Sequence, residues 1–255
     1  MKIIESVNNT LIKQFRSLSV KKYREQFSLF IVEGEKVVKE SLQYDNLVEY
    51  VLINIDFREK YTDIIERFND KVLLVGNDIF KSLSHTVEPQ NIMSVCKFLN
   101  ANIEEVMTDR LLVLDRLQDP GNLGTIIRSA VASGFDDIVL IDSVDPYNDK
   151  TIRSASGTIF FPKFYKVSTN QFIEFTKKSG YDIIVAEAGK TSVFDDKLSI
   201  PNRIALVIGN EGNGVSDEIM SNKSKSVSIP MDKRVESLNA GVSASILMFL
   251  LANKK

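Results

Sequence analysis

The sequence predicts an α/β fold with a mostly parallel sheet, preceded by a smaller α/β domain. Short apolar runs typical of strands alternate with amphipathic runs typical of helices along most of the 255 residues. Such alternation indicates a parallel sheet that helices cover on both faces. A polar stretch over residues 100–109 interrupts the pattern, so we expect two domains, residues 1–105 and 106–255.

The first domain begins with a predicted helix over residues 11–24 that has a basic face and no acidic residue. Such a run is either a solvated helix face or an arm that contacts nucleic-acid phosphates, and both interpretations stay open. Its basic residues are Lys13, Arg16, Lys21, Lys22 and Arg24. The remaining elements expected here are strands over residues 30–32, 48–55, 72–75 and 92–98 and helices over 34–42 and 62–68.

The second domain repeats the alternation with longer apolar strands. Ser216 is expected to cap a short helix, with Asp217 and Glu218 favourable against its dipole. The last helix is expected over residues 237–252, where Ser237 is a candidate cap. The other predicted elements are strands over residues 111–114, 137–141, 182–186, 204–208 and 226–229 and helices over 122–133 and 172–178.

Composition excludes several kinds of chemistry. The chain has 32 Lys and Arg against 34 Asp and Glu, a net charge of −2, so any nucleic-acid binding must come from a local patch. One Cys and one His cannot build a zinc or iron–sulfur site, so we expect no metal. His85 has no G-x-S-x-G partner motif, and Cys96 fits a buried strand. No apolar run could span a membrane, and we expect a cytoplasmic protein.

Three loops that leave predicted strands carry unusual residues, and ligands collect at such strand ends. Residues 119–124 form a Gly-rich turn, and Arg128 follows about one helical turn later. Residues 209–214 are Gly-rich but in the order G-x-x-G-x-G, and their Glu211 would repel phosphate. The third loop, over residues 229–241, brings Ser237 and Asn239 to the mouth of the last helix.

Together the three loops resemble the SpoU/TrmH family of RNA 2′-O-ribose methyltransferases in the SPOUT superfamily. The matching segments are residues 119–128, 206–215, and 229–231 with 236–239, in the family's order. The resemblance implies a trefoil-knotted catalytic domain, a homodimer, and S-adenosylmethionine as cofactor. It also implies that the cofactor contacts Gly209, Ile229 and Leu238.

The same resemblance assigns the chemistry. Arg128 is the implied catalytic residue, with Asn122 and Glu211 orienting the site around it and Ser237 and Asn239 completing it. A guanidinium hardly deprotonates in proteins. We therefore expect Arg128 to pair with the RNA phosphate and to stabilise developing alkoxide charge.

The first domain is similar to the L30e-like substrate-binding domain of these enzymes, through residues 30–34 and 86–90. Two departures are Asn91, where relatives commonly have Gly, and Ala240-Gly241 after Asn239, where Val-Ser is commoner. A separate domain of this kind favours 23S ribosomal RNA over transfer RNA as the substrate. The alternatives are a tRNA 2′-O-methyltransferase, a non-catalytic ribosome-associated RNA-binding protein, and a nucleotide-dependent oxidoreductase, which the glycine order disfavours.

Overall fold

The computed structural model describes residues 1–84, 86 and 88–254, which form two compact units. The first unit consists of Met1–Phe98 and Tyr147–Phe160, and the second of Leu99–Pro146 and Phe161–Lys255. The sequence contains no signal that residues 147–160 pack with the first unit. His85 and Val87, which the sequence analysis named, lie outside the described residues.

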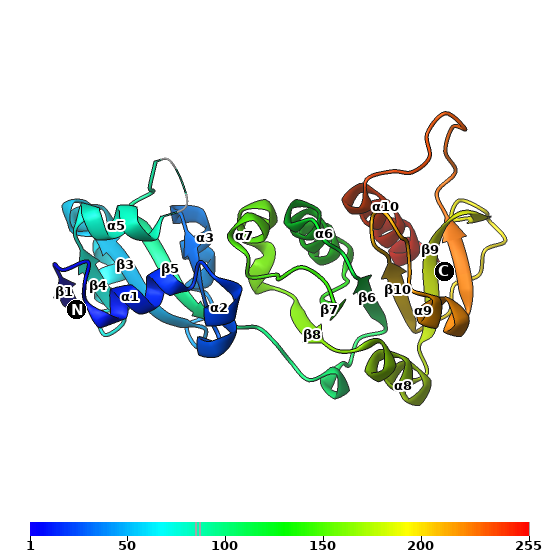
Figure 1. Ribbon diagram of the computed structural model, residues 1–255, viewed down its shortest axis with the longest axis horizontal. Helices are drawn as coiled ribbons and strands as arrows, with labels where there is room; N and C mark the ends of the chain where they lie inside the picture. Colours follow the sequence, from blue (N-terminus) through cyan, green and yellow to red (C-terminus); the bar gives the residue numbers. More distant parts are fainter. Residues whose placement is uncertain (85, 87, 255) are drawn as a thin grey trace. The chain divides into compact units, whose positions relative to one another are not determined.

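The first unit is built on a mixed five-stranded sheet in the order β1-β4-β3-β5-β2 (Figure 1). Strands β1, β4 and β3 are parallel, whereas β5 runs antiparallel to both β3 and β2. Four of these strands were predicted, and the three-residue β1 was not. The strands are β1 (Lys2–Ile4), β2 (Leu29–Glu33), β3 (Val48–Asn54), β4 (Val72–Val75) and β5 (Ile92–Lys97).

The helix predicted over residues 11–24 is two helices, α1 (Thr10–Ser17) and α2 (Lys21–Phe27). Between them Val20 is extended, with φ −101° and ψ 129°. The guanidinium of Arg24 is buried, and its Nη1 donates to the carbonyls of Leu18 at 2.7 Å and Ser19 at 2.9 Å. Arg24 thereby satisfies carbonyl groups that the end of α1 leaves open.

Helices cover both faces of the first sheet. Apolar side chains of α1 and α5 pack on one face, together with Leu52, Leu73 and Val95. On the opposite face Ser41 of α3 donates a hydrogen bond of 3.1 Å to Ser94, whose side chain alternates with that of Val95. The remaining elements of the unit are α3 (Glu35–Ser41), η1 (Ile55–Tyr61), α4 (Thr62–Arg67), α5 (Asn77–Leu83), α7 (Asp149–Ala155) and η3 (Thr158–Phe160).

The second unit has a six-stranded, fully parallel sheet in the order β11-β9-β10-β6-β7-β8, as the alternating pattern predicted. All strands but β8 were predicted within a few residues, although β9 is six residues longer than expected. They are β6 (Arg110–Asp115), β7 (Asp137–Ile141), β8 (Lys163–Lys166), β9 (Asp182–Ser192), β10 (Ile204–Ile208) and β11 (Lys225–Ser228).

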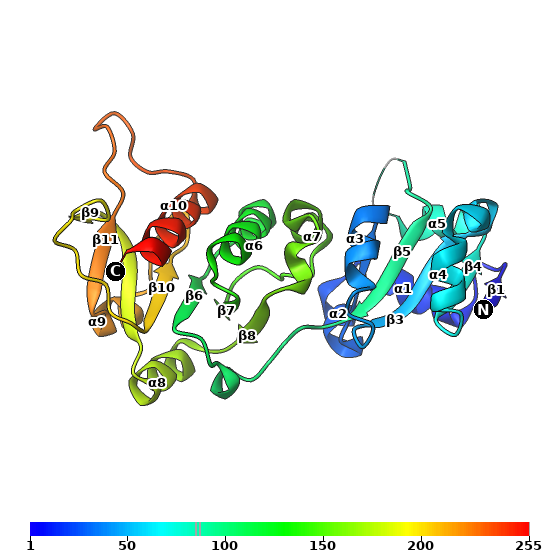
Figure 2. The ribbon, with the colours of Figure 1, turned by 180° about the vertical axis from the view of Figure 1, so that it is seen from behind.

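Two pairs of helices sandwich this sheet (Figures 1 and 2). α8 (Thr169–Ser179) and α9 (Asp217–Asn222) bury Phe172 and Ile219 against Val113 and its neighbours on one face. On the other face α6 (Pro120–Ser133) lies beside α10 (Ala240–Asn253). A short helix, η2 (Ile103–Glu105), precedes β6. The trefoil knot stays a prediction, because strand order alone does not say whether the chain threads a loop.

The last helix begins three residues later than predicted. Its N-cap is Asn239, whose Oδ1 accepts from the backbone N–H of Gly241 at 2.9 Å and of Val242 at 3.3 Å. Ser237 is therefore not the cap. A Cβ on Gly241 would lie 3.1 Å from Oδ1 of Asn239, so the glycine leaves room for the atom that caps the helix. Among the described residues, no helix is long and apolar enough to cross a bilayer.

Candidate functional site

The three loops singled out in the sequence meet at one edge of the second sheet. Strands β6, β10 and β11 are parallel to their neighbours, so the loops that follow them leave at the same edge. β6 leads into the turn before α6, where Asp119 caps the helix and accepts from the N–H of Asn122 at 2.8 Å. Pro120 occupies the first helical position, where a missing N–H costs nothing.

The loop over residues 209–214 is closed on itself by backbone bonds. Asn210 and Gly214 exchange both N–H···O bonds, at 3.0 and 2.9 Å. A Cβ on Gly209 would lie 2.4 Å from the carbonyl carbon of Gly214, so only glycine fits there. The side chain of Asn210 accepts from the N–H groups of Gly212 and Asn213 and donates to the carbonyl of Arg116 at 2.8 Å. Asn210 therefore organises the loop, a role the sequence analysis missed.

A buried carboxylate at the end of β6 fixes the far side of that loop. Asp115 is 0% exposed, and its Oδ2 accepts from the N–H of Ser216 at 2.6 Å. Its Oδ1 lies 3.4 Å from Nε of Arg116, which adopts a left-handed backbone with φ +59°. Ser216 occupies the predicted N-cap position of α9, but its side chain forms no capping bond. The sequence did contain a signal for this role, because Asp115 is an acidic residue at the end of an apolar strand.

Three predicted site residues form one hydrogen-bonded relay. Asn239 donates from Nδ2 to Oδ1 of Asn122 at 2.9 Å, and Asn122 donates from Nδ2 to Oε1 of Glu211 at 3.1 Å. Because Oδ1 of Asn239 accepts from the first N–H groups of α10, its amide can point only this way, and the orientation passes on to Asn122. Each amide keeps a further N–H for a ligand.

The carboxylate of Glu211 lies at the N-terminus of α6. The backbone N–H groups of Gln118 and Asp119 point at its two oxygens, at 3.4 and 3.5 Å. A negative charge is favoured at a helix N-terminus by the helix dipole. This geometry accounts for a glutamate inside a Gly-rich loop. In a nucleotide-binding loop the N-terminus of the helix binds a phosphate, whereas here the carboxylate of Glu211 lies there.

Beside the relay lies a cavity of about 410 Å³. Gly209, Ile229 and Leu238, the three predicted cofactor contacts, all line it, as do Ser237 and Asn239. Its volume falls within the range of about 300–1,000 Å³ common for cofactor pockets. Of the described residues that line it, only Glu187 and Glu211 carry a charge. No described lining residue is a cation that could bind a phosphate group, which disfavours a phosphorylated ligand.

Glu187 on β9 was not anticipated. Its Oε2 accepts from Nζ of Lys223 at 2.7 Å and from Oγ of Ser226 at 2.6 Å, and Lys190 lies 3.3 Å from Oε1. The bond from Lys223, followed by that from Ser226, lowers the pKa of Glu187 to about 2. The carboxylate stays ionised at any physiological pH.

Arg128 lies apart from the cavity of its own chain. It is exposed on α6, does not line the cavity, and makes no hydrogen bond or ion pair with the residues that the structure describes. Ser237 lines the cavity with an exposed side chain. The structure thus brings together four of the five predicted catalytic residues and leaves Arg128 outside.

The predicted RNA-binding residues of the first unit divide into two kinds. Lys13, Lys21 and Lys22 are exposed, and Arg16 is exposed while donating to Oγ of Ser82 at 3.0 Å. Arg24 is 5% exposed and is held by the end of α1. Its guanidinium is held by hydrogen bonds within the fold, so only the other four residues stay candidates for the predicted phosphate contacts.

Asn91 and Cys96 have structural explanations. Asn91 has φ +61°, a left-handed conformation that Gly adopts freely and Asn tolerates, and its Oδ1 accepts from Nδ2 of Asn54 at 2.9 Å. The loop therefore keeps a backbone conformation open to glycine. Cys96 lies buried in β5, as predicted, and burial raises the pKa of its thiol to about 12. Within the described part of the chain, no His, Cys, Asp and Glu cluster could hold a metal ion.

Comparison with known proteins identifies the family of the chain. Residues 109–249 match the family model of the SpoU rRNA Methylase family, and residues 9–94 match that of the MRM3-like substrate binding domain. The 23S rRNA (guanosine(2553)-2′-O)-methyltransferase RlmP of Bacillus subtilis is 32% identical, over 98% of this chain and 99% of that protein. An uncharacterized tRNA/rRNA methyltransferase of Synechocystis is 28% identical, over 96% and 92%.

Solved structures share the whole architecture. An AdoMet-bound rRNA methyltransferase from Sinorhizobium meliloti has a TM-score of 0.86 and 25% identity, over 98% of this chain and 97% of that one. The methyltransferase AviRb from Streptomyces viridochromogenes, in complex with AdoMet, has a TM-score of 0.83 at 24% identity and supports the fold alone. The resemblance inferred from the three loops is confirmed: the chain belongs to the SpoU rRNA methylase family.

Proposed function

We propose that this protein methylates the ribose 2′-hydroxyl of one nucleotide in large-subunit ribosomal RNA, in the cytoplasm and as a homodimer. Its family makes it an S-adenosylmethionine-dependent RNA 2′-O-methyltransferase. The observation that carries the proposal is the cavity beside the Asn239–Asn122–Glu211 relay, whose described lining residues include no cation. The single buried Cys96 fits a reducing compartment.

The residues of the cavity fit S-adenosylmethionine. The methyl donor is a sulfonium cation with an amino-acid tail and carries no phosphate, and the only charged groups among the described lining residues are two carboxylates. Gly209, Ile229 and Leu238 offer backbone groups that can bind an adenine without charged side chains. A dinucleotide would place two phosphates next to Glu187 and Glu211, so the oxidoreductase alternative is disfavoured.

When bound, the cofactor supplies an electrophilic methyl group. The chain must then position a ribose hydroxyl and stabilise its developing negative charge. The relay presents fixed amide N–H groups of Asn122 and Asn239 at the mouth of the cavity, and Glu211 holds them in orientation. We assign Arg128 to the RNA phosphate and to the developing alkoxide, as a charged donor and not as a base.

Ribosomal RNA is favoured over transfer RNA by two observations. The first unit does not contain the candidate cofactor cavity, and residues 9–94 within it match the model of a substrate-binding domain. One relative that matches over nearly its full length, at 32% identity, is named for 23S rRNA. A net charge of −2 gives no bulk attraction to a polyanion, so recognition has to come from that unit.

The test is methyl transfer from labelled S-adenosylmethionine to separated transfer RNA, small-subunit RNA and large-subunit RNA. We expect label in large-subunit RNA, in a dinucleotide that resists alkaline hydrolysis because its 2′-oxygen is methylated. Arg128→Ala protein, purified identically, controls for a contaminating enzyme. Label in transfer RNA alone would refute the ribosomal assignment. RNA binding without any transfer would support the non-catalytic alternative.

The proposed dimer uses the exposed side of α10. Val242 and Phe249 are 46% and 45% exposed and lie seven residues apart, on one face of a helix without a charged residue. α10 is joined to α6 by a hydrogen bond of 2.6 Å between Ser245 and Ser129, next to Arg128. Arg128 does not line the cavity of its own chain. The proposal therefore includes that Arg128 of one subunit completes the active site of the other subunit.

Subunit mixing tests this arrangement. Arg128→Ala and Glu211→Ala should each be inactive as homodimers. A mixture of the two should regain up to about a quarter of wild-type activity, because mixed dimers hold one intact site. Light scattering should give twice the 28.7 kDa of one chain. A fully active monomer, or no regain of activity in demonstrably mixed dimers, would contradict the shared site.

A further inference from the structure

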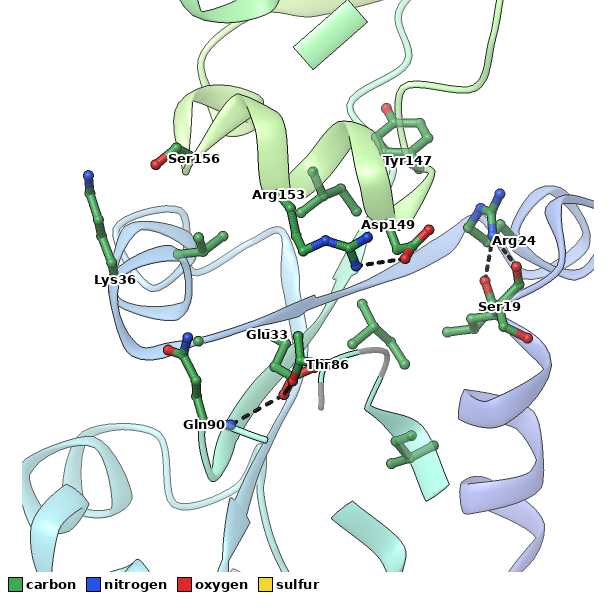
Figure 3. A pocket seen from close by; sticks show the side chains of 16 residues that line it. Ser19, Arg24, Glu33, Lys36, Thr86, Gln90, Tyr147, Asp149, Arg153 and Ser156 are labelled. Atoms are coloured by element: carbon green, nitrogen blue, oxygen red, sulfur yellow. Dashed lines mark hydrogen bonds and ion pairs between the residues drawn. The ribbon is translucent and has the colours of Figure 1, made fainter. Parts of the chain in front are cut away.

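The first unit contains a cavity of its own, of about 250 Å³, which the proposed chemistry does not use (Figure 3). It lies between β2, α3 and α7, all of which belong to this unit. Most of its wall is apolar and could enclose a flat ring. The apolar side chains that line it are Leu18, Ile31, Val37, Leu83, Tyr147 and Ile152.

An anionic group faces this apolar wall without an ion pair to any described residue, although Arg24, Lys36 and Arg153 also line the cavity. The carboxylate of Glu33, at the end of β2, is held by uncharged donors only: Oγ of Thr86 at 3.0 Å and the N–H of Gln90 at 3.3 Å both reach Oε1. Oγ of Ser84 lies 2.9 Å from both oxygens and has one hydrogen to give. Among the described residues no Lys or Arg pairs with Glu33, so Oε2 keeps an open lone pair.

The residues next to Glu33 pack closely against one another. Gly34 has φ +109°, and a Cβ there would lie 2.8 Å from Oε1 of Gln90, so the amide of Gln90 packs directly over the glycine. Figure 3 shows Glu33, Thr86 and Gln90 together on one side and Arg153 and Asp149 of α7 on the other. The result is a hydrogen-bonded acceptor at the wall of an apolar slot, a combination typical of sites that recognise the polar edge of a ring.

We propose that this cavity binds a single unstacked guanine of the RNA substrate and that Glu33 reads the base. The inference rests on the proposed RNA function and deepens it. The volume is slightly below the range of whole-ligand pockets, which suits one ring system attached to a chain that stays outside. Lys36, exposed at the rim and without an ion pair among the described residues, is available to the adjoining phosphate.

The choice of guanine follows from the charge of the acceptor. A carboxylate attracts N–H groups and repels ring nitrogens and carbonyls that carry lone pairs. Along their Watson–Crick edges, adenine and cytosine place an acceptor nitrogen beside the amino group, and uracil flanks its one N–H with two carbonyls. Guanine alone offers two adjacent N–H donors, at N1 and N2. Unpaired RNA bases are read along this edge.

The experiment measures binding of fluorescein-labelled pentanucleotides to the full-length protein by anisotropy, without S-adenosylmethionine. The probes are U-U-X-U-U with X as guanosine, adenosine, cytidine or inosine, the last lacking only the N2 amino group. We expect guanosine to bind about tenfold more tightly than adenosine or cytidine, the discrimination typical of one good base contact. Inosine should lose much of this preference with the protein unchanged.

Glu33→Gln should abolish the preference, because the amide brings its own N–H groups to face those of guanine. The matched control is Glu66→Gln, which removes an equal charge from an exposed position of α4 in the same unit. It should keep the preference while any nonspecific gain in RNA affinity appears equally in both variants.

Several outcomes would overturn the proposal: equal binding of the pentamers, no binding at millimolar concentration, or a guanosine preference that survives Glu33→Gln. A free guanine nucleotide has the same edge, so unlabelled 5′-GMP is a further arm. If unlabelled GMP displaces the labelled pentanucleotide at the same concentration as the unlabelled pentanucleotide does, the cavity would be assigned to a free nucleotide instead. Failure here with intact methyl transfer to ribosomal RNA would refute the pocket alone, whereas loss of both would refute the RNA function.

Discussion

The aromatic cluster of the first unit allows a quantitative test of its least expected feature, the inclusion of residues 147–160. Phe30 on β2 and Tyr147 are 0% and 1% exposed, and their ring centroids lie 4.7 Å apart at an angle of 33°. A buried aromatic pair at this spacing contributes about 0.5–1.5 kcal/mol beyond its buried area. We therefore expect Phe30→Leu and Tyr147→Leu each to lower the free energy of unfolding by about 1–3 kcal/mol.

The coupling between the two substitutions is the decisive quantity. The double variant should be more stable than the sum of the single effects by about 1 kcal/mol, because either change alone removes the shared contact. Urea unfolding followed by far-UV circular dichroism suits a chain without Trp. Phe30→Leu with Phe57→Leu, whose ring is 41% exposed, should be additive. A coupling below about 0.3 kcal/mol would refute the packing of Tyr147 on β2.

Three further predictions concern the second unit. Arg128→Ala should lower methyl transfer by about 100- to 1,000-fold while cofactor affinity in calorimetry stays within about twofold, as removal of a transition-state donor does; turnover within a few-fold of wild type would exclude the assigned role. Gly209→Ala should weaken S-adenosylmethionine binding at least about tenfold, since its Cβ would lie 2.4 Å from the carbonyl carbon of Gly214, whereas Gly212→Ala, with 3.6 Å to its nearest neighbour, should be tolerated. The pKa of Glu187 is lowered from 4.5 to about 2, so its contribution to the free energy of unfolding is complete above pH 4.5 and is lost as the pH falls toward 2. The wild-type protein should be more stable than Glu187→Gln by about 1 kcal/mol after solvent screening, and this difference should shrink over that pH range. A difference that grows on acidification would contradict the assignment.

Much of the fold was accessible from the sequence because apolar periodicity records burial. The central strands β6, β7 and β10 were predicted because a strand buried on both faces is a continuous apolar run bounded by polar turns. Both edge strands have only four residues, and neither has a long apolar run. β11 was still predicted because Pro230 marks its end, whereas β8, with the sequence Lys-Phe-Tyr-Lys, was missed. The helix predicted over residues 11–24 failed for another reason. Its break depends on Arg24 reaching back to the carbonyls of Leu18 and Ser19, a contact that periodicity does not encode.

The site shows the same division between local and long-range information. The family resemblance singled out Asn122, Glu211 and Asn239, each of which follows a strand end or begins a helix. It missed Asp115 and Asn210, whose role is to hold one loop against another across long sequence separations. The resemblance also assigned all five predicted catalytic residues to one site, whereas Arg128 does not line the cavity of its own chain. No pattern within one sequence states which chain completes a site.

Charge separation explains how a slightly acidic protein can act on a polyanion. In our proposal the carboxylate of Glu211 disfavours phosphate at the cavity, so the RNA backbone stays out of the space assigned to the cofactor. The proposal assigns RNA affinity to a few exposed cations of the first unit, among them Lys13, Lys21 and Lys22, because the net charge provides no general attraction. Binding that rests on so few phosphate contacts is weak on arbitrary RNA. Selectivity must therefore come from shape and from base edges such as the one proposed for Glu33, and only an RNA that satisfies the first unit is held long enough to present its ribose to the second.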